Sequence, residues 1–271
     1  MDKTTVFCPS GRDLAVDDFA QHSGRIPEIT WTTEGVKLLG GMLGTDNFKA
    51  DEAQNKVAKV THLMEEILQL KDPHRQLTLL RFCVSGFKIG ILLRVTDAAG
   101  YTGPLIDLDK ALDDAISITI GSTVSKKQRE LIGMPIKLGG LGIPSACSIA
   151  GASYTASRKQ SSKLQEQILN LPNDKHDAAM QQLLTTSGIQ QEISWASFPE
   201  QRSNLQHKLL NTLSKHRATT IANEISPREK VLLEARQAQE SVPWISLLCS
   251  ESVDSVNTFL HISFANDGQR A

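Results

Sequence analysis

The segment Gly35-Val-Lys-Leu-Leu-Gly-Gly-Met-Leu-Gly44 constrains the fold most, because it separates a short strand-like part of the chain from a long helical part. Val36, Leu38 and Leu39 favour a strand, whereas the four glycines favour a tight turn or a close approach of the backbone to a neighbour. We therefore predict a strand, a glycine turn and a second short strand over residues 35–44. The segment leaves open which partner needs the close approach.

The residues before this segment contain two further predicted strands. The β-branched run at residues 4–8 ends at Pro9-Ser-Gly11, and residues 29–32 alternate apolar and polar side chains as a half-buried strand does. One brief helix is predicted between them, near Leu14 and Phe19. The first 48 residues thus look like the edge of an antiparallel sheet, which is too small to form a domain unaided.

From Asp46 onward, apolar residues recur at the three- and four-residue spacing of helices. Asp72-Pro73 is typical of a helix start, and Gly86 and Gly90 are expected to bend or break the helix that follows. A glycine-rich loop is predicted over residues 134–145. The fold class is therefore mainly α with a short antiparallel β piece, and the later helices are predicted at residues 104–121, 126–132 (capped by Ser125), 146–157, 163–171, 174–185, 205–222, 227–239 (with a capping box from Ser226 to Glu229) and 252–260.

Composition limits the class of protein more than its function. Lys plus Arg number 29 against 30 for Asp plus Glu, so net charge neither demands nor excludes a polyanionic partner. The four cysteines are far apart and lack metal-binding spacing, which indicates reduced thiols in an intracellular protein, nuclear or cytoplasmic. No apolar stretch is long enough to span a bilayer, and the first residues lack the apolar run of a secretion signal. We expect neither membrane insertion nor secretion.

Two groups of basic residues stand out from an otherwise balanced charge pattern. Between positions 71 and 94 only Asp72 opposes five cations, and Glu130 alone opposes the second group. Such strips can neutralise a phosphate backbone, but from the residues alone a solvated helix face is the favoured reading. The first strip consists of Lys71, Arg75, Arg81, Lys88 and Arg94, and the second of Lys126, Lys127, Arg129 and Lys137.

Other chemistry is poorly represented. The seven histidines stand singly on predicted polar faces, and no Gly-x-Ser-x-Gly motif occurs. Gly139-Gly-Leu-Gly142 lacks the Lys-Ser/Thr of a phosphate-binding loop and does not follow a strand, so we interpret it as a turn. The sequence thus predicts no nucleophilic triad and no nucleotide-binding loop.

Several segments, in order, resemble the reverse transcriptases of non-LTR retrotransposons from the end of the palm through the thumb. Residues 1–9 look like the strand of polymerase motif D, and Val36-Lys-Leu-Leu-Gly-Gly-Met-Leu43 is similar to motif E, the primer grip. No single motif is decisive, but their order is that of the family. The further similar segments are Gln76-Leu-Thr-Leu-Leu-Arg81, Ile91-Leu-Leu-Arg94, residues 135–146, Ala152-Ser-Tyr-Thr-Ala-Ser157, Leu205-Gln-His-Lys-Leu209 and Pro243-Trp-Ile245.

The resemblance implies three regions and a nucleic-acid partner. Residues 1–48 would be a palm remnant, 49–133 thumb helices, and 134–271 a glycine-rich loop with a helical extension. Lys3 corresponds to the motif D lysine, which in the family is thought to assist pyrophosphate departure. The residues implied to contact an RNA/DNA template-primer duplex are Lys37, Gly40, Gly41, Lys71, Arg75, Arg81, Lys88, Arg94 and Lys137.

The sequence departs from the family in its catalytic carboxylates. Polymerases hold two Mg²⁺ ions with aspartates of a Tyr-x-Asp-Asp box and an earlier strand, and both lie upstream of motif D. The only adjacent aspartate pairs here, Asp17-Asp18 and Asp113-Asp114, lie in helical contexts, so we predict neither a metal site nor a cofactor in this chain. We expect a fragment that binds template-primer but is inactive alone.

Two alternatives remain open. The chain could be a helical scaffold whose apolar faces bind protein partners, or part of a polymerase completed by a palm-bearing chain. The sequence does not indicate the oligomeric state. Because lone strands bury little surface, we expect Ile29, Trp31 and Val36 to be partly exposed.

Overall fold

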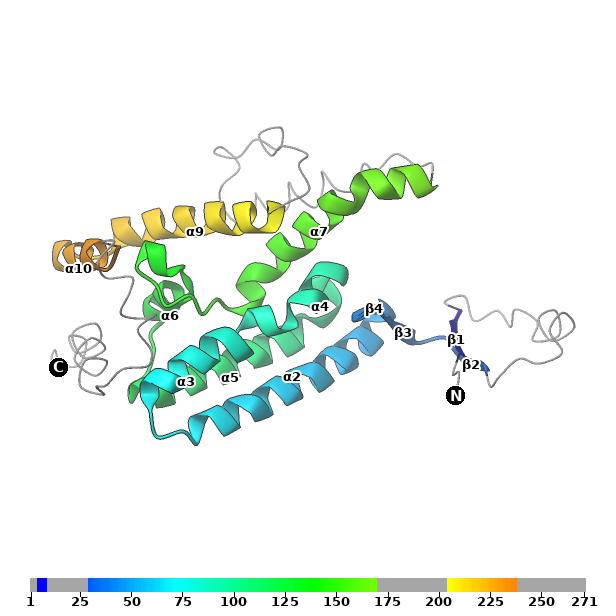
Figure 1. Cartoon of the computed structure of the whole chain (residues 1–271), viewed down its shortest axis with the longest axis horizontal. Coiled ribbons are helices and arrows are strands. Elements are labelled where there is room, and N and C mark those ends of the chain that lie inside the picture. The colour runs from blue at the N-terminus through cyan, green and yellow to red at the C-terminus, as the bar shows by residue number, and fades with distance from the viewer. Residues whose placement is uncertain (1–3, 9–28, 170–203, 238–271) are drawn as a thin grey trace, which may run out of the picture.

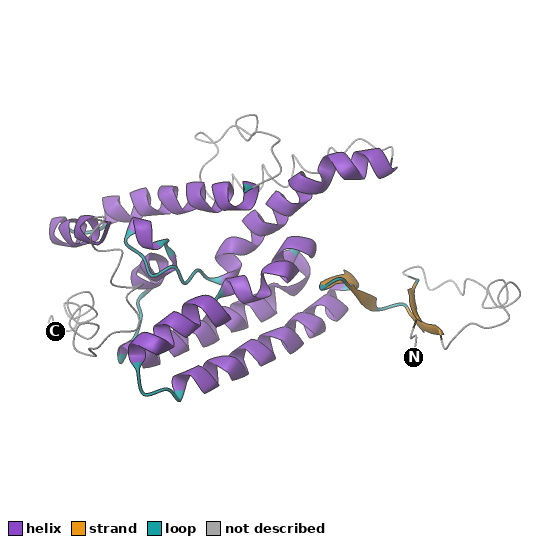
Figure 2. Cartoon of the chain, viewed as in Figure 1, coloured by secondary structure: helices purple, strands orange, loops and turns teal. Residues whose placement is uncertain are grey.

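The computed structural model describes residues 4–8, 29–169 and 204–237 (Figure 1). Helices dominate it, and strands occur only near the N-terminal end of the described chain (Figure 2). The mainly α fold class with a short antiparallel β piece is confirmed. Several predictions lie outside the described residues: Lys3, the helix near Leu14, the helices at 174–185 and 252–260, and the Pro243-Trp-Ile245 segment.

The predicted hairpin is present over the glycine-rich segment. Strands β3 (Gly35–Leu38) and β4 (Gly41–Gly44) pair antiparallel, with Leu38 opposite Gly41. The two turn residues, Leu39 and Gly40, have φ values of 49° and 86°. Two central residues with positive φ are the geometry of the tight turn whose twist suits a two-residue hairpin. Val36 is half-buried, as predicted, while the side chains of Ile29 and Trp31 lie outside the described residues.

The strands before the hairpin pair differently from the expectation of one antiparallel edge. Strand β1 (Thr4–Phe7) lies parallel to β2 (Ile29–Thr32), with Val6 opposite Trp31. Parallel pairing requires a connection of a dozen or more residues, and β1 and β2 are far enough apart in sequence to meet this requirement. The described strands therefore form two separate two-stranded sheets.

Two long helices form the centre of the main core. Helix α2 (Asp46–Leu68) begins at Thr45, whose side chain accepts a hydrogen bond from the backbone N–H of Phe48, and it lies beside α5 (Thr102–Ile120) (Figure 1). Each helix buries one apolar stripe at three- and four-residue spacing, as the sequence predicts. The buried residues include Val57, Val60, Met64 and Ile67 of α2 and Leu105, Leu108, Leu112 and Ile116 of α5.

The segment between these helices is broken, as the two glycines predict. Helix α3 (Pro73–Leu79) is capped by Asp72 and continues into the π-helical turn η1 (Leu80–Val84). The short helix η2 (Gly86–Ile89) and α4 (Gly90–Val95) follow, and η3 (Ala98–Tyr101) leads into α5. A Cβ atom at Gly86 would lie 3.0 Å from the Cα of Ala146. The chain breaks here because another helix passes too close for a side chain.

That passing helix is α7 (Ala146–Leu169), one continuous helix where the sequence predicted two. The polar stretch at residues 158–162 was expected to be a connection. Instead, the helix continues through it, and Ser161 and Ser162 donate side-chain hydrogen bonds to carbonyls three and four residues earlier. The start of α7 contributes Ala146 and Ile149 to the core that α2 and α5 form, so one core spans both sides of the boundary predicted at residue 133.

The remaining elements form a second, smaller core. Helix α6 (Lys126–Gly133) begins with the predicted cap at Ser125; η4 (Ile136–Leu138), α9 (Leu205–Glu224) and α10 (Pro227–Gln237) follow. The predicted capping box at the start of α10 is present, because the backbone N–H of Glu229 donates to Ser226 Oγ and the backbone N–H of Ser226 donates to Glu229 Oε2. The core residues are Met134, Ala218, Ile221 and Leu233.

Candidate nucleic-acid interface

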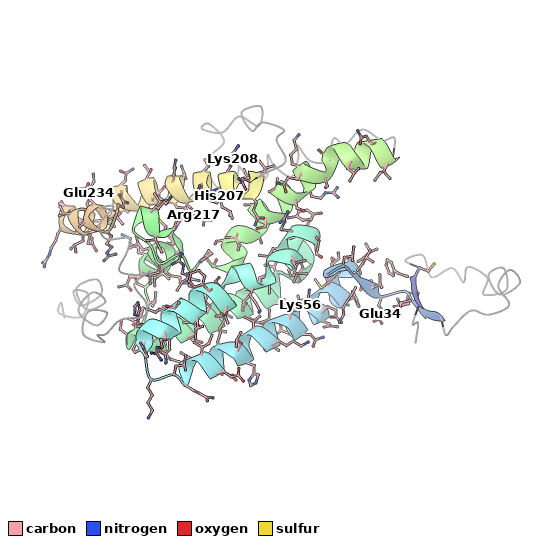
Figure 3. All side chains as sticks on the ribbon, in the orientation of Figure 1. Glu34, Lys56, His207, Lys208, Arg217 and Glu234 are labelled. Carbon is pink, nitrogen blue, oxygen red and sulfur yellow. The ribbon has the colours of Figure 1, made fainter. Side chains whose placement is uncertain are left out.

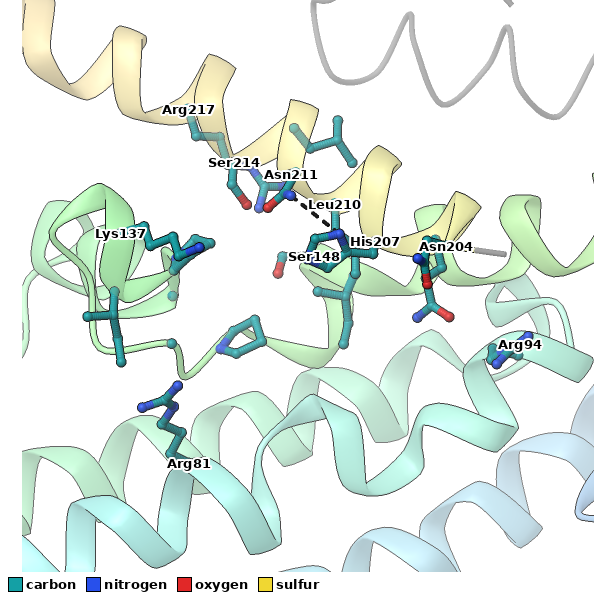
Figure 4. Close-up of a pocket in the computed structure, with 18 of the residues that line it drawn as sticks. Arg81, Arg94, Lys137, Ser148, Asn204, His207, Leu210, Asn211, Ser214 and Arg217 are labelled. Atoms are coloured by element: carbon teal, nitrogen blue, oxygen red, sulfur yellow. Dashed lines mark hydrogen bonds between the residues drawn. The ribbon is translucent and has the colours of Figure 1, made fainter. Parts of the chain in front are cut away.

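A cleft of about 810 Å³ lies between α9 and the helices of the main core (Figure 4). One wall is the face of α9 that carries His207, Asn211, Ser214 and Arg217. The opposite side is formed by η1, α4, the loop after α6 and the first part of α7. Helix α9 can stand off from the main core here because its C-terminal half is held by the second core.

Four cationic side chains line this cleft, and no aspartate or glutamate is among its described lining residues. Arg81, Lys137 and Arg217 lie toward one end, and Arg94 lies toward the other (Figure 4). Within the described part of the chain, none of these four cations forms an ion pair. The cleft therefore concentrates positive charge in a protein whose overall charge is close to zero.

Arg81 is held by its surroundings without being neutralised. Its guanidinium carbon lies 4.8 Å from the centroid of the neighbouring Phe82 ring, and its Nε would lie 3.0 Å from a Cβ atom at Gly142. Partial burial lowers the pKa of Arg81, although an arginine remains charged near neutral pH. Arg81 and Phe82 both belong to the π-helical turn η1, a geometry that is frequent at functional sites.

Arg217 lies on α9, opposite Arg81. Crowding by protein atoms lowers its pKa, and the negative charge of Glu130 partly opposes this effect, yet the side chain keeps access to solvent. Lys137 is also exposed, and Arg94 donates a long hydrogen bond of 3.4 Å to Gln160 Oε1 of α7. The four cations can thus reach a ligand without first breaking an ion pair within the described residues.

Polar groups without charge complete the cleft. His207 Nδ1 lies 3.4 Å from Asn211 Nδ2, so His207 accepts a hydrogen bond from Asn211 in the tautomer that leaves Nδ1 unprotonated. Asn204, Ser148 and Ser214 also line the space (Figure 4). Such groups donate to and accept from phosphate, sugar and base edges.

The sequence-predicted contact residues divide into two sets. Arg81, Arg94 and Lys137 come together in the cleft. The others lie away from it: Lys37 pairs with Glu52 at 2.5 Å, Arg75 pairs with Asp72 at 3.1 Å, and Lys71 and Lys88 are exposed elsewhere.

The predicted primer-grip glycines are packed against protein. A Cβ atom at Gly41 would lie 2.7 Å from Val95 Cγ2, and one at Gly40 would lie 3.1 Å from Ile91 Cγ2. The carbonyl of Gly40 accepts a hydrogen bond of 2.9 Å from Lys56 Nζ. In the described residues, the close neighbours of this hairpin are therefore helices α4 and α2.

Two other sequence features have structural roles. Arg129, counted in the second basic strip, donates through Nε to Asp113 and through Nη1 to the carbonyl of Ile143 at 2.8 Å, so it ties the glycine-rich loop to α5. A Cβ atom at Gly140 would lie 2.1 Å from the carbonyl oxygen of Met134, which agrees with the interpretation of this loop as a tight turn.

The sequence missed the part of the site that lies on α9. Arg217 and Asn211 belong to no motif, His207 lies in the Leu205-Gln-His-Lys-Leu209 segment but was not named as a contact, and Phe82 was not considered. The available signal was the spacing: His207, Asn211, Ser214 and Arg217 recur at three- and four-residue intervals and so form one polar face of a helix. That face lines the cleft, although His207 and Arg217 remain exposed, and the sequence alone does not reveal this position.

Among the described residues, no three His, Cys, Asp or Glu side chains gather closely enough to hold a metal ion. Asp113, from one of the two aspartate pairs, is instead a partner of Arg129. None of the helices in the described ranges is long and apolar enough to cross a membrane.

No protein-family model, curated protein or solved structure matches this chain. The likeness to reverse transcriptases therefore stays a prediction that depends on the order of short motifs in the sequence.

Proposed function

We propose that this chain is the thumb side of a reverse transcriptase of the non-LTR type, and that it binds the phosphate backbone of nucleic acid through the cleft beside α9. One observation carries the binding proposal: Arg81, Arg94, Lys137 and Arg217 line one space that contains no described acidic side chain. The motif order in the sequence supports the family, and an intracellular location, nuclear or cytoplasmic, belongs to the same proposal.

Phosphate is the ligand that suits this arrangement best. Guanidinium groups match phosphate oxygens in pairs, and an ammonium such as that of Lys137 adds a point charge. A small carboxylate would need only one or two cations, whereas four cations distributed along a cleft suit a ligand with repeating negative charges. The amide and hydroxyl groups between the cations suit the sugars and bases that link those charges.

The test is binding to an RNA/DNA hybrid whose template strand extends as an overhang of about 12 nucleotides. We expect the logarithm of the binding constant to fall with the logarithm of salt concentration, with a slope of about −3 if four phosphates of a single strand are neutralised. Arg217→Gln should reduce the slope by about 0.7. Fluorescence anisotropy at several salt concentrations measures both.

Lys208→Gln is the matched control for this variant. Lys208 is also on α9, but it does not line the cleft (Figure 3). The control should leave affinity and slope unchanged. Absence of binding at low salt, or equal losses in both variants, would contradict the proposal.

One observation favours a second function, the binding of a protein partner. Five apolar side chains on two neighbouring elements, the hairpin and α4, are exposed: Leu38 (62%), Leu39 (93%), Leu43 (54%), Ile91 (66%) and Val95 (51%). Patches of this kind mark protein interaction sites. In a reverse transcriptase, the partner would be the part of the polymerase that carries the catalytic palm, whether in the same polyprotein or in another chain.

Primer extension with Mg²⁺ in the presence of a palm-bearing polypeptide tests this second function. We expect extension only in the mixture, and loss of it in the Leu43→Asp variant, which places a charge in the apolar patch. Val231→Asp is the control, because Val231 is equally exposed (64%) but lies on α10. Failure of every mixture to extend a primer would exclude assembly into a polymerase.

A further inference from the structure

We infer that the cleft binds a single strand of RNA or DNA rather than a double helix, and that one base stacks on the ring of Phe82. This inference rests on the proposed nucleic-acid binding and specifies the form of the ligand. It differs from the sequence-based expectation that duplex phosphates are the contact.

The dimensions of the cleft favour a single strand. Its lining residues on α9 extend from Asn204 to Arg217, which is about 20 Å of helix at 1.5 Å per residue. A volume of about 810 Å³ spread over that length describes a narrow cleft. A complete duplex is wider than its own major groove, which is about 12 Å across, so its full width does not fit within such a cleft.

The distribution of charge suits a strand that runs along α9. Arg81, Lys137 and Arg217 surround one end, and Arg94 is beside Asn204 at the other (Figure 4). Successive phosphates of a stacked strand advance about 3.4 Å along the helix axis, so about six of them span the cleft. A backbone that enters near Arg94 would end among three cations.

Phe82 provides a surface for a base. Its side chain is 65% exposed although it lines the cleft, so much of the ring is open to a ligand. Arg81 lies over the ring at 4.8 Å, so the two side chains form a stacked pair. Bases of single strands stack on aromatic rings and on guanidinium planes, and a phosphate can contact the same arginine through its N–H groups.

Both side chains belong to the π-helical turn η1. Adjacent residues of a regular helix point about 100° apart, so they seldom serve the same site. Here Arg81 and Phe82 are neighbours in η1 and both line the cleft. Ser85, which is buried, donates to the carbonyl of Arg81 at 2.8 Å and helps to hold this turn.

The test compares three fluorescein-labelled probes: oligo(dT) and oligo(U) of about 12 nucleotides, and a DNA duplex of the same length. We expect both single strands to bind at least tenfold more tightly than the duplex, and affinity to stop rising beyond about six nucleotides. Phe82→Ala should weaken single-strand binding by about tenfold or more, the effect of losing one stacked base. Phe82→Tyr should retain it.

Ile118→Ala is the matched control, because Ile118 is exposed to a similar extent (63%) on α5 but does not line the cleft. It should leave binding unchanged, and circular dichroism should show that each variant is folded. Equal affinity for duplex and single strand, together with no effect of Phe82→Ala, would overturn this inference while leaving nucleic-acid binding intact. No binding of any probe would instead contradict the proposed function itself.

Discussion

The backbone N–H of Met42 donates a hydrogen bond of 3.0 Å to Oγ1 of Thr96, and both residues are buried. Met42 belongs to strand β4, and Thr96 ends helix α4, so this bond fastens the hairpin to the helical part of the chain. The carbonyl of Thr96 in turn accepts a hydrogen bond of 3.0 Å from the Tyr101 hydroxyl. The hairpin is thus attached through a short chain of buried polar groups.

Replacement of Thr96 by valine should detach the hairpin. The change keeps the shape of the side chain but leaves the buried N–H of Met42 without an acceptor, which costs about 1–3 kcal/mol. Thr96→Ser, which keeps the hydroxyl, should cost less. Urea denaturation measures the difference, and hydrogen exchange at Met42 should accelerate only in the valine variant. Equal stability of the two variants would show that the bond contributes little.

Replacement of Leu39 by asparagine should stabilise the hairpin. Leu39 has a φ of 49° and is 93% exposed, so its side chain gains little from packing and occupies a backbone region that leucine disfavours. Asparagine tolerates this region, and we expect a gain of about 0.5–1 kcal/mol in the free energy of unfolding. Leu38→Asn is the control, because Leu38 is also exposed but lies in a strand. A gain in the control as well would point to solubility rather than backbone geometry.

The Gly41→Ala variant separates two explanations for the glycines of residues 35–44, namely contact with a ligand and close packing against α4. A Cβ atom at this position would lie 2.7 Å from Val95 Cγ2, so the added methyl group should destabilise the chain by about 1–3 kcal/mol. The double variant Gly41→Ala/Val95→Ala should recover much of that loss, as thermal denaturation would show. If Gly41→Ala left stability unchanged and weakened nucleic-acid binding, the glycine would serve a ligand instead of the packing of α4.

The carboxylate of Asp109 should control the reactivity of Cys147. Asp109 on α5 accepts hydrogen bonds from the backbone N–H groups of Ala146 at 2.6 Å and Cys147 at 3.0 Å, and so caps α7. The Cys147 side chain is exposed, but crowding by protein atoms, followed by the negative charge of Asp109, raises the pKa of its thiol to about 12. The raised value disfavours the thiolate, so this thiol should react slowly with iodoacetamide at pH 9, where an ordinary cysteine is largely ionised.

Asp109→Asn should shift the alkylation profile of Cys147 to lower pH, but only in part, because crowding by protein atoms is the larger cause. The direction of this pKa shift can also be tested by measuring the free energy of unfolding as a function of pH. A thiol whose pKa is raised by folding stabilises the protein below the unfolded value of about 9, and this contribution is lost as pH rises toward 12. Cys147→Ser should remove that alkaline dependence. A pH profile that is identical in both proteins would contradict it.

Local features of this fold could be predicted from the sequence because their causes are local. The hairpin follows from strand formers around glycines, and the helix starts at Asp72, Ser125 and Ser226 follow from side chains that cap neighbouring N–H groups. The break near Gly86 was also predicted, although its cause, the passage of Ala146, lies sixty residues away in the chain. Periodicity then identified the core faces of α2 and α5.

The remaining features depend on partners that are distant in sequence. The parallel pairing of β1 and β2 places Thr4 opposite Ile29, and α7 continues through a polar stretch that resembles a connection. Arg129 resembles one more surface cation in the sequence, but its side chain donates hydrogen bonds to Asp113 and to the carbonyl of Ile143. Three cations that line the cleft were named from a charge pattern, whereas Arg217 was not.

The two sides of the cleft belong to packing units of different size. Its floor is part of the large core, whereas the C-terminal half of α9 is secured by a core of only four buried residues. Small cores confer low local stability, so we expect this end of α9 to open at temperatures that leave α2 and α5 intact. We therefore expect a bound strand to stabilise this end of α9. Mild heating should release the strand at temperatures well below the unfolding of the main core.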